Sequence, residues 1–92
     1  MIGTEKQIKW AQDIIAGAEA ACDRIIRDAE AYERTGDASI NRPVKVEVAQ
    51  QIKAMVLDGL AKTETASEII NMRGRLSYNT MLGMALQFSA QH

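Results

Sequence analysis

The fold is decided by residues 4–34, which read TEKQIKWAQDIIAGAEAACDRIIRDAEAYER. Apolar or small residues recur along this stretch at alternating intervals of three and four, the spacing that places them on one face of a helix. They are Ile8, Ala11, Ile15, Ala18, Cys22, Ile25, Ala29 and Tyr32. Thr4 and Gln7 form a T-x-x-Q capping box at the start, and Gly36 follows the end in a position that favours glycine. The stretch therefore predicts one helix of about 45 Å.

The sequence of residues 43–60 predicts a second helix. Pro43 suits the first turn of a helix, where a backbone N–H would have no intrahelical acceptor. Residues 44–48, VKVEV, alternate between apolar and charged as a strand does, whereas residues 48–60 return to helical spacing. A lone strand has no partner with which to pair, so we interpret the whole segment as helical.

The remaining residues predict two further helices. Thr65 and Glu68 form a second capping box, T-x-x-E, which opens a short helix that Gly74 ends. Ser77 then caps a last helix with an apolar stripe. The predicted fold class is all-α: a small helical bundle with a long N-terminal helix and three shorter helices, in a single domain over residues 1–92.

Composition excludes several classes of protein. The chain has 92 residues, a formal net charge of −1 and 25% charged residues, which does not suit a general nucleic-acid-binding protein. No apolar run is long enough to span a membrane, and neither a leader peptide nor a disulfide is expected. One cysteine and one terminal histidine do not make a metal site. We therefore expect a cytoplasmic protein with no membrane contact, no metal and no cofactor.

The sequence does not predict an enzyme. It has no Gly-rich phosphate loop and no nucleophile or zinc motif, and its carboxylates fall among polar residues on predicted solvent faces. Cys22 lies on the apolar face of the long helix, where a small buried hydrophobe is expected rather than a reactive thiol. We expect no catalytic residues.

Lys6, Lys9 and Trp10 are not required by helix capping and form a first candidate surface for binding a partner. Trp10 lies one position off the apolar face of the long helix. It either packs at the edge of the core or faces a partner as an interaction hot spot.

Arg73, Arg75, Tyr78 and Asn79 form a second candidate surface. No acidic residue follows Glu68, so the two arginines are predicted to form the most basic part of the surface, beside the start of the last helix. The two helices around Gly74 resemble a helix-turn-helix that would contact nucleic acid, or else they form an ordinary corner between helices.

The apolar face of the long helix predicts a homodimer or a higher homo-oligomer. No single shorter helix is long enough to cover that face, so we expect Ile15, Ala18, Cys22 and Ile25 to contact a second copy. The main alternative is that the shorter helices, arranged end to end, cover the face within one chain.

Two stretches carry a resemblance to known proteins. Residues 3–14, GTEKQIKWAQDI, and residues 65–73, TASEIINMR, resemble shared segments of a group of small uncharacterised phage and prophage proteins. That group opens on G-[TS]-E-K-Q-I-x-W-A, and its second segment has an aromatic residue where this chain has Glu68. The resemblance implies a phage-associated origin and transfers no catalytic or binding residues.

Two functional hypotheses follow. In the first, the chain is a non-enzymatic phage accessory protein that binds and inhibits a host defence protein, such as a CRISPR effector, in the host cytoplasm. In the alternative, it is a small DNA-binding or DNA-associated protein that uses its C-terminal helix pair. The arginine pair alone would favour a third and weaker hypothesis, a protein that sequesters a nucleotide messenger.

Overall fold

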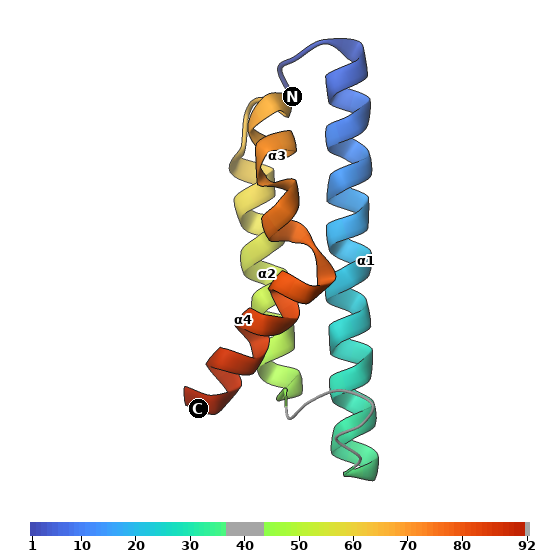
Figure 1. Cartoon of the computed structure of the whole chain (residues 1–92), viewed down its shortest axis with the longest axis vertical. Coiled ribbons are helices and arrows are strands. Elements are labelled where there is room, and N and C mark those ends of the chain that lie inside the picture. The colour runs from blue at the N-terminus through green and yellow to red at the C-terminus, as the bar shows by residue number, and fades with distance from the viewer. Residues whose placement is uncertain (37–43, 92) are drawn as a thin grey trace.

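The chain forms a bundle of helices aligned along one long helix (Figure 1). The structure is a computed structural model and describes residues 1–36 and 44–91. Its elements are α1 (Glu5–Thr35), α2 (Val46–Lys62), α3 (Ala66–Met72), the 3-10 helix η1 (Arg73–Leu76) and α4 (Tyr78–Gln91). No strand occurs among the described residues, and the predicted all-α bundle with a long N-terminal helix is confirmed.

Both ends of α1 are set by the residues that the sequence indicated. The backbone N–H of Gln7 donates to Thr4 Oγ1 over 3.2 Å. The backbone N–H of Thr4 donates to Gln7 Oε1 over 3.1 Å, which completes the capping box. At the other end Gly36 adopts a φ of 70°, and its N–H donates to the Tyr32 carbonyl. The left-handed conformation of Gly36 explains why a glycine ends this helix.

The second helix begins three residues later than predicted. α2 begins at Val46, and Pro43 lies outside the described residues. Val44 precedes the helix with its side chain fully buried, and the Lys45 amide donates to Ser89 Oγ over 3.0 Å. These contacts with the rest of the bundle hold residues 44 and 45 outside the helix.

The prediction that Gly74 ends the third helix is wrong in position, because α3 ends at Met72. Gly74 lies inside η1, and among the described residues only Gly3 and Gly36 have a positive φ. The flanking caps are as expected: Thr65 Oγ1 accepts from the Glu68 amide, and Ser77 Oγ accepts from the Thr80 amide, both over 3.3 Å. The chain therefore passes from α3 into α4 through a continuous tight turn.

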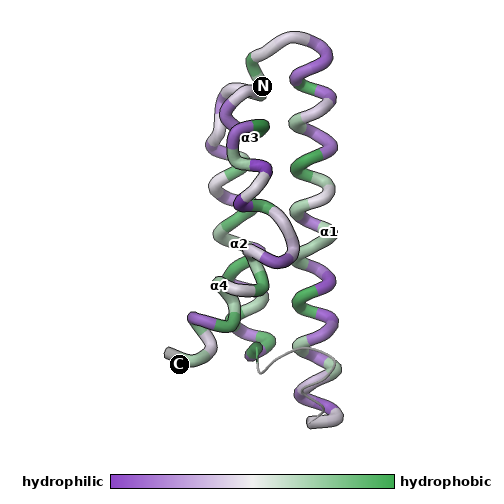
Figure 2. The backbone as a smooth tube through the Cα atoms, viewed as in Figure 1, coloured by the Kyte–Doolittle hydropathy of each residue, from purple (hydrophilic) through white to green (hydrophobic). Residues whose placement is uncertain are grey.

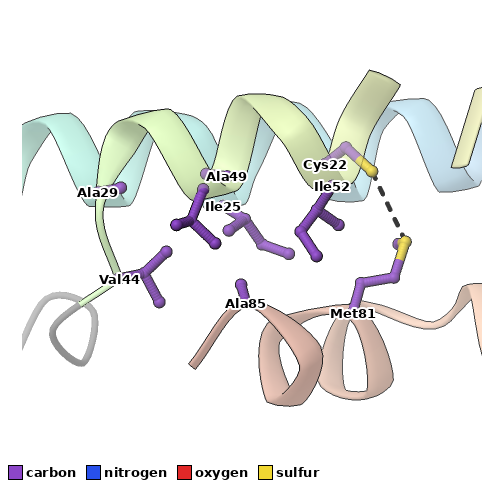
Figure 3. Packing of buried hydrophobic residues seen from close by; sticks show 9 residues of the cluster. Cys22, Ile25, Ala29, Val44, Ala49, Ile52, Met81 and Ala85 are labelled. Atoms are coloured by element: carbon purple, nitrogen blue, oxygen red, sulfur yellow. Dashed lines mark hydrogen bonds between the residues drawn. The ribbon is translucent and has the colours of Figure 1, made fainter. Parts of the chain in front are cut away.

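The apolar face of α1 is covered from within the chain (Figures 1 and 2). One cluster joins α1, α3 and the end of α2 and consists of Ala11, Ala18, Leu60, Ala66 and Ile69. A second cluster joins α1, α2 and α4 (Figure 3) and consists of Cys22, Ile25, Ala29, Val44, Val48, Ala49, Ile52, Met81 and Ala85. Successive helices thus cover successive parts of α1, which is the alternative that the sequence left open.

The predicted oligomer interface is therefore wrong at three of its four residues. Ala18, Cys22 and Ile25 are each 1% exposed in the single chain, because α2, α3 and α4 pack on them. Ile15 is half-buried and lines a surface hollow beside Leu57. Residues that are already buried within one chain cannot also form an interface between copies of this fold.

Candidate functional site

An exposed tryptophan and an arginine meet near the N-terminal end of the bundle. The guanidinium carbon of Arg73 lies 5.3 Å from the centre of the Trp10 ring, within the range of a cation–π contact. Arg73 Nη1 also donates to the Ile70 carbonyl over 2.7 Å, which fixes the guanidinium over the indole. Trp10 remains 49% exposed. Lys6 and Lys9 are exposed in the same two turns of α1, and we call these four residues, Lys6, Lys9, Trp10 and Arg73, the Trp10–Arg73 surface.

Backbone pairing brings the two halves of this surface together. The Ile2 amide donates to the Glu64 carbonyl and the Ala66 amide donates to the Ile2 carbonyl, both over 2.8 Å. These two bonds form a parallel bridge between Ile2 and Thr65, which holds the start of α3 beside the start of α1. The two stretches that carry the resemblance are therefore neighbours in space at this end of the bundle.

Close packing continues from this bridge to the Trp10–Arg73 surface. Gly3 lies against Ala66, and Trp10 and Arg73 each follow seven residues later, about two helical turns along their segments. Ala11 and Ile69 are fully buried between α1 and α3. The small Ala11 side chain allows the two helices to approach, so that Arg73 reaches Trp10.

Tyr78 is engaged inside the bundle and lies apart from Trp10. Its hydroxyl donates to Asp28 Oδ2 over 3.2 Å, and the Arg24 guanidinium lies 4.5 Å from its ring centre. Burial, together with the Asp28 carboxylate, raises the pKa of Tyr78 above its ordinary value. Arg24 follows Trp10 by fourteen residues, about 21 Å along α1. The structure thus gives Tyr78 the role of joining α4 to α1.

Arg75 and Asn79 are exposed, but the structure does not gather the second candidate surface into one site. Arg73 turns towards Trp10 instead of towards the start of α4. Arg75 forms no ion pair with any described residue. The first residue of α4, Tyr78, packs on α1, so this helix does not present its opening turn as a recognition helix does.

Cys22 is a core residue. Its Sγ donates to Met81 Sδ over 3.6 Å (Figure 3), and burial raises the pKa of the thiol. A thiol that is buried and held protonated is a poor nucleophile. Within residues 1–36 and 44–91, no group of three or more His, Cys, Asp and Glu side chains gathers as a metal site would require.

Sequence reasoning missed a second exposed apolar surface. Met55 of α2 is 63% exposed and Phe88 of α4 is 37% exposed, and both line one hollow. The signal that was available is the absence of Asp, Glu, Lys and Arg after Arg75. This absence leaves α4 without a charged face.

None of the helices in the described part of the chain is both long and apolar enough to cross a membrane. Comparison of the chain with protein-family models, with curated proteins and with solved structures finds no match.

Proposed function

We propose that this chain is a non-enzymatic, phage-associated protein that acts by binding a host protein through the Trp10–Arg73 surface. The favoured target is a defence protein in the host cytoplasm, and the chain would inhibit it in the manner of an anti-CRISPR protein. The observation that supports binding is the half-exposed indole of Trp10, which Arg73 holds in one orientation.

Tryptophan and arginine are among the residue types that are enriched at interaction hot spots. Binding a partner through mobile side chains loses conformational entropy, and a side chain that is already held in place loses less. Trp10 is on a long helix and Arg73 is bound to both the indole and the Ile70 carbonyl. The surface is therefore pre-organised for contact with a complementary apolar or aromatic pocket.

A protein partner suits this surface better than DNA does. Binding to phosphates requires several cations that converge, and it weakens steeply with salt. Here the guanidinium of Arg73 faces an indole, and the carboxylates of Glu5 and Asp13 are exposed in the same turns of α1. A tryptophan and an arginine surrounded by polar side chains match the enriched centre and the polar rim of a protein interface.

Phage plating on a host with active CRISPR immunity tests the proposal. We expect expression of the chain to restore plaques of a targeted phage, Trp10→Ala to abolish the effect, and Arg27→Ala, an exposed change elsewhere on α1, to retain it. Purified effector should bind the chain directly and bind Trp10→Ala at least tenfold more weakly, the loss of a typical hot spot. Unchanged inhibition by Trp10→Ala would overturn the role of this surface.

The DNA-binding alternative has its own test. Arg75 is exposed without an ion pair to any described residue, and it is the residue that this alternative needs. Titration with duplex and single-stranded DNA at low and moderate salt should show no binding. Binding that falls steeply with salt and is lost in Arg75→Ala would replace the protein-inhibitor proposal.

A further inference from the structure

The last helix presents an uncharged surface to solvent. No Asp, Glu, Lys or Arg occurs from Leu76 onward, although a quarter of the whole chain is charged. The exposed residues of α4 include Thr80, Gly83, Gln87 and Phe88, and its buried residues, such as Met81 and Ala85, face the core. A solvent-facing helix ordinarily carries charges on its outer side. A surface that has few charged residues and an exposed aromatic side chain is typical of the central part of a protein interface.

An edge of α2 extends this surface. Met55 is 63% exposed beside Phe88, and the two side chains line a hollow of about 180 Å³ together with Val48, Gln51 and Ile52. The hollow is large enough to receive the end of one apolar side chain. We call the exposed residues Met55, Thr80, Gly83, Gln87 and Phe88 the α4 surface.

We infer that the α4 surface binds a second copy of this chain, with the α4 helices side by side across a two-fold axis. A charged partner surface would lose its hydration against this face and gain no ion pair in return. A second α4 surface has no charge to desolvate, and a two-fold arrangement lets each copy offer apolar side chains to the hollow of the other. A Cβ at Gly83 would meet nothing within 4 Å in the chain, so the outer side of α4 is open to a close neighbour.

The chain exposes more surface than a compact domain of its mass and length. The chain exposes 5929 Å², whereas a compact monomer of its mass, 10.1 kDa, exposes about 5300 Å². Its radius of gyration is 14.4 Å, against about 12 Å for a compact domain of this length. The elongated chain, 47 × 21 × 16 Å, therefore leaves more of its surface open to a partner than a compact domain does.

The α4 surface is separate from the Trp10–Arg73 surface. Trp10 lies in the first third of α1, at the end of the bundle that holds the N-terminus and α3, whereas α4 runs towards the other end and turns away from α1 (Figure 1). One dimer would therefore present two Trp10–Arg73 surfaces. The inference does not depend on the proposed function, because copies would associate whether or not a host protein binds.

The mass of the full chain in solution tests the inference. Light scattering at micromolar concentrations would compare the wild type with Met55→Glu and Phe88→Glu, since these are the exposed apolar side chains of the α4 surface. Ala20→Glu adds the same charge at an exposed position of α1 and is the control. We expect two-chain masses for the wild type and the control, and half that mass for the other two variants. A single-chain mass for the wild type overturns the inference.

A pair of glycine variants decides the matter if either glutamate variant fails to fold. Gly83→Lys and Gly17→Lys both place a lysine in a helix where a Cβ meets nothing within 4 Å, so both should fold. Only Gly83 lies on the α4 surface. We expect Gly83→Lys to halve the mass and Gly17→Lys to leave it unchanged, with the same circular dichroism for both. Equal masses for the two variants overturn the inference.

Discussion

Gly3 and Ala66 pack so closely that a Cβ added at Gly3 would lie 3.0 Å from the Cβ of Ala66. The same added atom would lie 3.3 Å from Gln7 Oε1, which accepts the Thr4 amide in the capping box of α1. The contact therefore joins the start of α1 to the start of α3, and it explains why a glycine precedes the capping threonine. Together with the bridge from Ile2 to Thr65, this junction holds α3 beside α1, where Arg73 contacts Trp10.

Replacing Gly3 by alanine should destabilise the fold by about 1–3 kcal/mol, because the new methyl group overpacks the junction and the backbone φ of 156° is one that side chains disfavour. Gly17→Ala is the matched control: a Cβ there meets nothing within 4 Å, and alanine should stabilise α1 by about 1 kcal/mol. Urea unfolding followed by circular dichroism measures both. A stable Gly3→Ala variant would show that the junction is loosely packed.

Arg73→Ala should change the fluorescence of Trp10, which is the sole tryptophan of the chain. Removing the guanidinium uncovers one face of the indole to water, so the emission maximum should shift to longer wavelength. The loss of the cation–π contact should also cost about 0.5–1 kcal/mol of stability. Arg75→Ala is the control, since Arg75 is exposed and forms no ion pair with any described residue. Equal spectra for both variants would contradict the contact.

The stability of the chain should fall as the pH rises above 9.0, the ordinary pKa of a cysteine thiol. Burial raises the pKa of Cys22, so the folded chain retains a proton that the unfolded chain releases. The stabilisation from the protonated Cys22 thiol is complete when the pH lies below the pKa of this thiol in the unfolded chain. It is lost as the pH rises towards the pKa of the thiol in the folded chain. Urea unfolding at about pH 8 and pH 10 should show that the free energy of unfolding falls less in Cys22→Ala than in the wild type. An equal loss of stability in the wild type and in Cys22→Ala would mean that the thiol is accessible to solvent.

The fold was largely predictable because its signals are local. The spacing of small and apolar residues along α1 and the caps at Thr4, Gly36 and Thr65 act within a few residues of themselves, and the structure confirms them. The start of α2 was not predictable in this way. It depends on the buried side chain of Val44 and on the bond from Lys45 to α4, which are contacts between distant segments.

The candidate site was predictable only in its parts. Trp10 and Arg73 were each selected from the sequence, but their contact depends on the bridge from Ile2 to Thr65, which no local pattern encodes. The interface prediction for the face around Cys22 failed for a related reason. It compared the length of α1 with single helices, whereas three helices in succession cover that face.

Tyr78→Phe should weaken the fold and leave partner binding unchanged. The substitution removes the hydroxyl that donates to Asp28 and keeps the ring on which Arg24 lies. Loss of one hydrogen bond to a charged group typically costs about 1.5–3 kcal/mol, and the partial exposure of this pair places the expected loss near 1 kcal/mol. Thermal unfolding measures this loss, with Asn79→Ala as the control because Asn79 is exposed on the same turn. Binding to the purified target should be equal in the wild type and in both variants. A Tyr78→Phe variant that keeps its stability but loses binding would return Tyr78 to the partner-binding surface predicted from the sequence.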